Sequence, residues 1–136
     1  MRRAALGGIM VAAMGLAACA SESPTGPGPN PAQAGWLTVE FVAPTGDVGG
    51  LLFTFSGGPI DSIRGNAGLQ AFARAASDAS WQVMLIGRPL PPGAIGAIHV
   101  PDVARAADYR ATITQVAARG THEQRDPAGY LIRLAP

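Results

Sequence analysis

The fold is decided by a segment that reads WLTVEFV, residues 36–42. Successive side chains of a β-strand point to opposite faces, so a half-buried strand shows apolar residues at every second position. Leu37, Val39 and Phe41 would share one face of such a strand, and Trp36 would lie on the other. The alternation predicts a strand that faces a hydrophobic core on one side.

Short apolar runs bounded by turn residues follow this segment along the chain. Turn signals such as Gly49-Gly50 and Pro101-Asp102 separate the runs. The run WQVMLI has one polar residue, Gln82, and predicts the clearest buried strand of the chain. Together with this run, residues 81–86, strands are predicted over residues 51–56, 60–64, 94–100, 109–117 and 129–134.

Two other segments allow a helical interpretation. Residues 69–77 are ambiguous: their apolar residues have helical spacing and alanine-rich strands are rarer, but a short helix and a strand would both be tolerated. Residues 101–107 predict a helical turn, with Asp102 as its N-terminal cap.

Many short strands separated by turn residues predict an all-β protein. We expect an antiparallel β-sandwich of immunoglobulin-like or jelly-roll type, with about 7–9 strands and room for one short helix. The residues expected between the two sheets are Leu37, Val39, Phe41, Phe53, Phe55, Val83, Leu85, Ile98, Ile113 and Ile132.

The beginning of the chain predicts an export signal. Residues 1–3 are Met-Arg-Arg, and residues 4–16 are uncharged and apolar, as in a secretory signal peptide. An alternative is a retained transmembrane helix over residues 4–20, which is close to the lower length limit for crossing a bilayer.

The end of this apolar segment, Leu16-Ala17-Ala18-Cys19, resembles the lipobox of bacterial lipoproteins. The resemblance implies that a signal peptidase recognises Leu16, Ala17 and Ala18 and cleaves before Cys19. It also implies that the Cys19 thiol carries a diacylglyceryl group and that its new amine takes a further acyl chain such as palmitate. Two or three chains give stable anchoring where one would not.

A proline-rich segment follows the lipobox. Residues 20–34 read ASESPTGPGPNPAQA, which predicts a tether without helix or paired strand and with a reach of about 45 Å. Ala20 and Ser21 lack the Asp that retains lipoproteins in the inner membrane, so the resemblance favours the outer membrane. The expected organisation is a signal peptide over residues 1–18, a lipidated tether over 19–34 and a β-sandwich domain over 35–136.

Three segments resemble cohesin domains and related bacterial surface sandwiches. They read GGLLFTFSGGPIDSI, PPGAIGAIHV and YRATITQVAA, within residues 49–118. The resemblance implies a nine-stranded sandwich that binds a partner module through one sheet face. No contact motif matches position by position, so it assigns no binding residue.

Charge and motifs limit the possible functions. The chain has 10 basic residues, all Arg, and 9 acidic residues; loss of Arg2 and Arg3 with the signal peptide would leave a side-chain charge of −1. No basic field would attract nucleic acid. Cys19 is the only cysteine, and no nucleophile elbow, phosphate loop or zinc-protease motif is present. We therefore expect no catalytic residue and no cofactor.

Metal binding has little support in the sequence. His122 and Glu123, with Asp126, could offer an imidazole and two carboxylates, but a charged loop beside a strand is typical of a solvated turn. Five other carboxylates near turns predict caps and turn hydrogen bonds, and their binding of calcium stays open: Asp47, Asp61, Asp78, Asp102 and Asp108.

Aromatic residues begin four of the predicted strands, where large rings close the ends of a sandwich core. They are Trp36, Trp81, Tyr109 and Tyr130. Trp36 is the candidate ligand-binding residue because it lies opposite the core-facing side chains. The sequence favours a non-catalytic, lipid-anchored cell-envelope protein that displays a sandwich for protein binding or in a structural or adhesive role. The alternatives are a carbohydrate- or peptidoglycan-binding module and, less favoured, a hydrolase or metalloenzyme.

Overall fold

A computed structural model describes residues 30–87 and 89–136. The lipobox residues Leu16, Ala17, Ala18 and Cys19, and most of the predicted tether, lie outside these ranges. Residues 31–136 form one compact unit that contains both sheets and the hydrophobic core. A fragment of these residues therefore has everything that the domain needs to fold by itself. No helix within the described ranges is long and apolar enough to cross a membrane.

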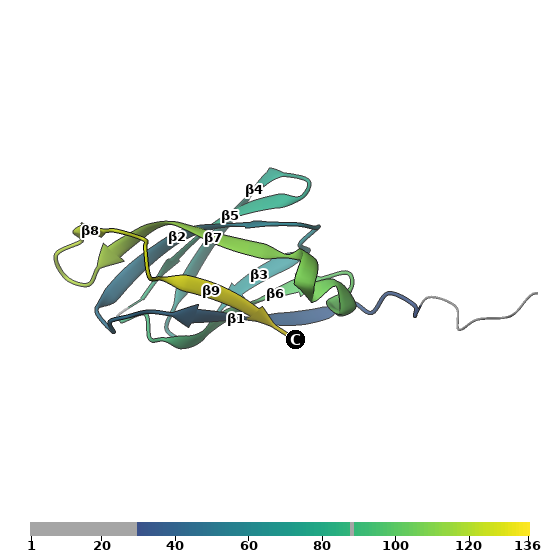
Figure 1. Ribbon diagram of the computed structural model, residues 1–136, viewed down its shortest axis with the longest axis horizontal. Helices are drawn as coiled ribbons and strands as arrows, with labels where there is room; N and C mark the ends of the chain where they lie inside the picture. Colours follow the sequence, from purple (N-terminus) through teal and green to yellow (C-terminus); the bar gives the residue numbers. More distant parts are fainter. Residues whose placement is uncertain (1–29, 88) are drawn as a thin grey trace, which may run out of the picture. The chain divides into compact units, whose positions relative to one another are not determined.

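One layer of the domain is a four-stranded antiparallel sheet with the order β3-β6-β1-β9 (Figure 1). Its strands are β1 (Gly35–Val42), β3 (Ser62–Gly65), β6 (Gly93–Val100) and β9 (Leu131–Ala135). Strand β1 is central, and its Leu37 lies opposite Ile98 of β6 while its Phe41 lies opposite Ile132 of β9. The segment that decided the predicted fold is thus paired on both sides.

The second layer is a five-stranded antiparallel sheet with the order β4-β5-β2-β7-β8. Its strands are β2 (Val48–Ser56), β4 (Gln70–Ser77), β5 (Ser80–Ile86), β7 (Arg110–Ala118) and β8 (Gln124–Arg125). The two sheets make nine antiparallel strands in the described part of the chain, which confirms the predicted antiparallel β-sandwich.

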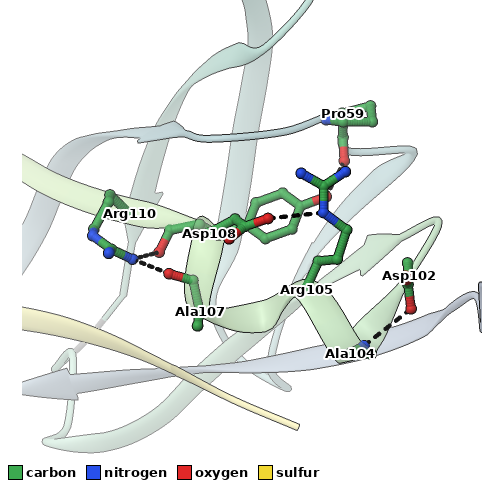
Figure 2. A network of polar contacts seen from close by, with 8 residues as sticks. Pro59, Asp102, Ala104, Arg105, Ala107, Asp108 and Arg110 are labelled. Carbon is green, nitrogen blue, oxygen red and sulfur yellow. Dashed lines mark hydrogen bonds and ion pairs between the residues drawn. The ribbon is translucent and has the colours of Figure 1, made fainter. Parts of the chain in front are cut away.

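A short 3₁₀ helix, η1 (Val103–Asp108), links β6 to β7 and confirms the predicted helical turn. The Asp102 carboxylate accepts a hydrogen bond from the Ala104 backbone N–H at 3.1 Å, so Asp102 is the cap (Figure 2). The same carboxylate accepts from the Gln33 N–H at 3.3 Å, and the Val103 N–H donates to the Gln33 carbonyl at 2.8 Å. The last residues of the tether are thereby fixed to the helix.

The hydrophobic core fills the space between the sheets. Phe53 and Phe55 meet edge to face with ring centroids 5.1 Å apart. Eight of the expected core residues are buried, but Ile113 and Ile132 are only partly so. Ile132 belongs to an edge strand. Ile113 lies in a part of β7 that has no neighbouring strand on its outer side, because the two-residue β8 pairs only with Val116 and Ala117. The buried apolar cluster comprises Leu37, Val39, Phe41, Val48, Leu51, Phe53, Phe55, Ile60, Val83, Leu85, Leu90, Ile95, Ile98, Val100, Tyr109, Val116 and Tyr130.

The passage from β2 to β3, where the chain crosses between the sheets, is closed by Tyr109. Its hydroxyl donates a hydrogen bond to the Pro59 carbonyl at 2.7 Å, and its ring packs against Gly58, where a Cβ would lie 2.8 Å from the phenol oxygen. Gly57 has φ 110°, and a Cβ there would clash with the Asp108 carbonyl. Burial raises the pKa of the Tyr109 hydroxyl. This junction joins β2, η1 and β7.

Several boundaries differ from those predicted. Residues 70–77 are the strand β4, which decides between the two interpretations of that segment. The loop around Glu123 contains the two-residue strand β8, because its backbone pairs with Val116 and Ala117. Ile60 is not part of β3 but is buried in the turn before it.

Candidate binding face

The outer face of the five-stranded sheet carries adjoining apolar side chains. Cross-strand pairing places Phe72 opposite Met84, and Met84 opposite Leu52. In the next row Ile86 lies opposite Gly50. Side chains directly opposite in neighbouring strands lie on the same face and touch. We call this surface the apolar face; it comprises Leu52, Phe72, Met84, Ile86 and Ala117.

The apolar face is open to solvent. Phe72 is 52% exposed, Met84 40% and Ile86 41%. The run WQVMLI, expected from the sequence to be a buried strand, is therefore buried only at alternate residues. The inward residues Val83 and Leu85 meet the core, but no third layer covers the outward ones in the described part of the chain. Contiguous exposed apolar side chains are unusual on a monomeric protein and mark interaction sites.

A groove of about 570 Å³ is hollowed into this face, beside the loop that joins β7 to β8. Leu52, Met84 and Ile86 line it together with Gln115. A second hollow of about 210 Å³ shares Leu52 and Met84 with the groove and extends to Phe72. Volumes of several hundred Å³ are typical of ligand sites, so the groove can hold several aliphatic groups.

Gly50 is the reason that the sheet surface is hollow here. It lies between Ile86 and Ala117 in adjacent strands, and its missing side chain leaves the space above the backbone empty. A Cβ at Gly50 would lie 3.7 Å from the Ala117 Cβ and 3.8 Å from the Leu85 carbonyl oxygen, which are ordinary contacts. The site can therefore accept a methyl group without displacing the backbone.

Both ends of the apolar face are cationic. Arg119 and His122 line the groove at the β7–β8 loop, and Arg74 lines the second hollow. Gln82 Oε1 accepts hydrogen bonds from Nε and Nη2 of Arg74 at 2.8 and 2.6 Å, which holds the guanidinium on the outer face. Among the described residues that line the two hollows there is no Asp or Glu. The face therefore favours an apolar ligand that also carries negative charge.

The outer face of the four-stranded sheet holds Trp36, which the sequence singled out. Trp36 is 40% exposed and lies, as expected, opposite the core-facing side chains of β1. Its ring already has partners: the Arg64 guanidinium carbon lies 4.0 Å from its centroid, and the His99 ring meets it edge to face at 5.1 Å. His99 Nδ1 lies 3.0 Å from an Asp61 carboxylate oxygen. Arg64 thus occupies a position that a stacked sugar ring would need.

The other aromatic candidates do not form a platform with Trp36. Tyr109 and Tyr130 are buried at 6% and 8% exposure, and Tyr130 stacks on Phe41 with centroids 6.1 Å apart. Trp81 is partly buried and packs against the core. The interpretation of these three rings as core or core-edge residues is confirmed.

Most of the acidic residues have local structural partners. Asp108 pairs with Arg105 at 2.8 Å within η1, near the site where Arg110 donates to the Ala107 carbonyl (Figure 2). Asp47 pairs with Arg125 of β8 at 2.5 Å. Asp126 accepts from the Ala128 N–H at 2.9 Å, as turn residues do.

Within the described ranges, no three His, Cys, Asp or Glu side chains come together in a way that could hold a metal ion. The combination of His122, Glu123 and Asp126 that the sequence offered is therefore not brought together. His122 instead lines the groove.

Comparisons with family models, curated proteins and solved structures found no match for this chain. The cohesin-like assignment stays a prediction. The sequence missed the apolar face because it arises from register: Phe72, Met84 and Leu52 come from three strands. Two signals in the sequence pointed towards it: the pair Gly49-Gly50 at the start of a strand, and the apolar residues Met84 and Ile86 on the face opposite Val83 and Leu85 in a chain with no long helix predicted to cover a sheet.

Proposed function

We propose that the mature chain is a non-catalytic lipoprotein of the cell envelope, anchored by lipid on Cys19, whose sandwich binds a partner protein through the apolar face. The exposed cluster of Phe72, Met84 and Ile86 is the observation that supports this proposal most directly. The groove beside it gives the partner a place to insert side chains. Binding would bury these residues and remove their contact with water.

The partner surface is aliphatic with neighbouring carboxylates. The groove and the second hollow offer apolar side chains in the middle and Arg119 and Arg74 at the two ends. Charged groups at a binding rim contribute specificity and speed of association more than affinity. The apolar centre therefore supplies most of the binding energy, and the arginines select and orient the partner.

The lipobox and the tether give this binding face its location. Acylation at Cys19 would hold the protein on a membrane, with the outer membrane favoured, and the proline-rich tether would keep the sandwich clear of the lipid surface. Metabolic labelling with palmitate tests the anchor: the full chain should take up label, and a Cys19→Ser variant should not. An unprocessed, unlabelled chain in the cytosol would overturn this part of the proposal.

The binding face is tested by a pair of variants with matched chemistry. Met84→Glu places a carboxylate in the centre of the apolar face, and Leu131→Glu does the same at a 52% exposed residue of the other sheet. Partners crosslinked to the lipidated protein in intact cells are identified and purified, and their affinities for the fragment 31–136 are then measured. Met84→Glu should weaken direct binding by at least about tenfold, since central residues dominate interface energies, and Leu131→Glu should not.

Two outcomes would contradict the assignment. If no envelope protein binds the purified fragment directly, the protein-binding function is wrong. If Leu131→Glu weakens binding as much as Met84→Glu does, the partner uses a different face.

A further inference from the structure

Strand β4 ends the five-stranded sheet with an unpaired edge. It pairs with β5 through residues 70–77, and no other described strand bonds to its far side. Every residue of β4 except Ala71 is exposed. The hairpin of β4 and β5 projects beyond the rest of the sandwich (Figure 1). The edge is therefore accessible to another chain.

This edge lacks most of the features by which proteins protect their sheets from pairing. Natural edge strands carry lysine, proline or an inward-pointing charge, or they are very short. Strand β4 spans eight residues, QAFARAAS, without lysine or proline. Its register irregularity lies between Ala75 and Ser77, so residues 70–75 pair regularly with β5. An uninterrupted stretch of regular edge is thus available.

The residues on this stretch are self-complementary. Ala71, Ala73 and Ala75 pair with Leu85, Val83 and Trp81, and so they point towards the inner side of the sheet. Phe72 and Arg74 pair with the outward residues Met84 and Gln82. Residues 71–75 therefore read AFARA, with only methyl groups on one side and one aromatic and one cationic side chain on the other.

We propose that two copies of the protein pair antiparallel through β4, about a two-fold axis at Ala73. This register places Ala73 opposite Ala73 and Phe72 of each copy opposite Arg74 of the other. Each guanidinium, held in place by Gln82, then meets an aromatic ring of the second copy. On the inner side, alanine meets only alanine, so the facing side chains are small enough for the two backbones to approach. Pairing joins the two five-stranded sheets into one.

Other two-fold registers fit less well. A centre at Arg74 would set two guanidinium groups directly against each other, which is destabilising. A centre at Phe72 would leave Arg74 facing the neutral Gln70 of the second copy. Pairing centred at Ala73 gives both Phe72–Arg74 contacts within the regular backbone of residues 71–75.

The geometry of the pair leaves the centre of the apolar face free, namely Leu52, Met84 and Ile86 with the larger groove, whereas Phe72 and Arg74 at its margin contact the second copy. Edge-to-edge pairing adds strands in the plane of the sheet, whereas the apolar face lies on its outer surface. Self-association therefore leaves the centre of the proposed partner site open, and the two contacts can fail separately, since Met84 variants test only the partner and Ala73 variants test the pairing. Anchoring by lipid would raise the effective concentration of the copies and strengthen a contact of this modest size.

Introducing a charged side chain at the two-fold axis tests the proposal. Ala73 is exposed, so Ala73→Glu and Ala73→Lys fragments of residues 31–136 should remain folded, as circular dichroism can verify. Sedimentation at high protein concentration should show dimers for the parent fragment and monomers for each variant alone, because like charges would meet at the axis. A mixture of the two variants should restore the dimer. Ala79→Glu and Ala79→Lys, in the turn of the same hairpin, are the matched controls and should dimerise like the parent.

Crosslinking tests the same register in the complete, lipidated chain. Cys19 would be blocked by lipid and is the only native cysteine, so Ala73→Cys would supply a single free thiol. Opposite residues of paired antiparallel strands bring their Cβ atoms to about 5 Å, within reach of a disulfide after small adjustment. Oxidation of membranes by oxygen with a copper catalyst should give a covalent dimer for Ala73→Cys and little for Ala79→Cys.

The results that would overturn the proposal are definite. A parent fragment that stays monomeric at every concentration, together with equal crosslinking at positions 73 and 79, would show that β4 does not pair with a second copy. Variants at position 73 that dimerise alone as well as when mixed would show that the dimer uses another surface. Loss of partner binding in Ala73→Lys without any change in dimerisation would assign the edge to the partner instead.

Discussion

The two outer faces of the sandwich hold equally exposed large apolar side chains in different surroundings. Trp36 on the four-stranded sheet and Met84 on the five-stranded sheet are each 40% exposed. Trp36 has Arg64 against its ring and His99 at its edge, whereas Met84 is surrounded by other exposed apolar side chains. Exposure alone therefore does not identify a binding residue. What distinguishes the apolar face is that several exposed apolar side chains adjoin one another across neighbouring strands and border a groove.

The largest expected effect on stability comes from a change at the junction of β2, η1 and β7, on which both sheets depend. Gly57→Ala places a methyl group against the Asp108 carbonyl at a positive φ, and it should cost about 2–4 kcal/mol of unfolding free energy. Urea unfolding of the fragment 31–136 measures the change. Gly46→Ala is the control, because a Cβ there has no neighbour within 4 Å, and it should stay within about 0.5 kcal/mol. Equal stability of the two variants would mean that the junction does not hold the sheets in place.

The next effect concerns the hydroxyl at the same junction. Tyr109→Phe removes the hydrogen bond to the Pro59 carbonyl and should cost about 1 kcal/mol at neutral pH. Burial raises the pKa of Tyr109 in the folded protein, so the unfolded chain loses this proton first as the pH rises. The contribution of Tyr109 is complete below the ordinary pKa of about 10 and is lost as the pH rises through the folded pKa. Urea titrations at several pH values should show a smaller alkaline loss of stability in Tyr109→Phe, and an identical loss would refute this assignment.

A third test separates the two outer faces directly. Trp36→Ala removes the contacts with Arg64 and His99 and should cost about 0.5–1 kcal/mol of stability while leaving partner affinity unchanged. Met84→Ala should do the reverse, with stability within about 0.5 kcal/mol and weaker partner binding. Calorimetric titration with the identified partner measures the affinities. If Trp36→Ala lost partner binding, or lost a glycan binding that the parent fragment shows, Trp36 would again be the ligand-binding residue.

The smallest change in stability is expected at the floor of the groove. Gly50→Ala adds a methyl group where only ordinary contacts await it, so the strand should become more stable by about 0.5 kcal/mol. The same methyl group fills part of the groove and should weaken partner binding. A variant that is more stable and binds normally would show that the partner does not enter the groove.

Local sequence patterns were sufficient for much of the fold. The alternation at Leu37, Val39 and Phe41 predicted a strand with one buried face, and all three side chains are buried. The segment Pro101-Asp102-Val103 predicted the start of η1 with Asp102 as its cap. These features depend on neighbours within a few residues, which is the range over which strand alternation and capping operate.

Features that depend on distant pairing were not predictable in the same way. The segment around Phe72 is rich in alanine, which suits helix and strand alike, and only pairing with β5 decides it. In β7 the register shifts opposite Leu52 and Phe53, so Ile113 and Val116 both face inward although they are three residues apart. The apolar face likewise needs the registers of three strands. A single sequence contains no direct record of such registers.

The way in which the tether enters the domain determines how the protein would carry mechanical load. Gln33 is bonded to Asp102 and Val103, and the chain then passes directly into β1, which is paired with β6 on one side and β9 on the other. A pull transmitted from the envelope would be shared by two ladders of hydrogen bonds, so that many bonds must break before the strand slides. A sandwich anchored through this end would thus be attached at a strand that is bonded on both sides.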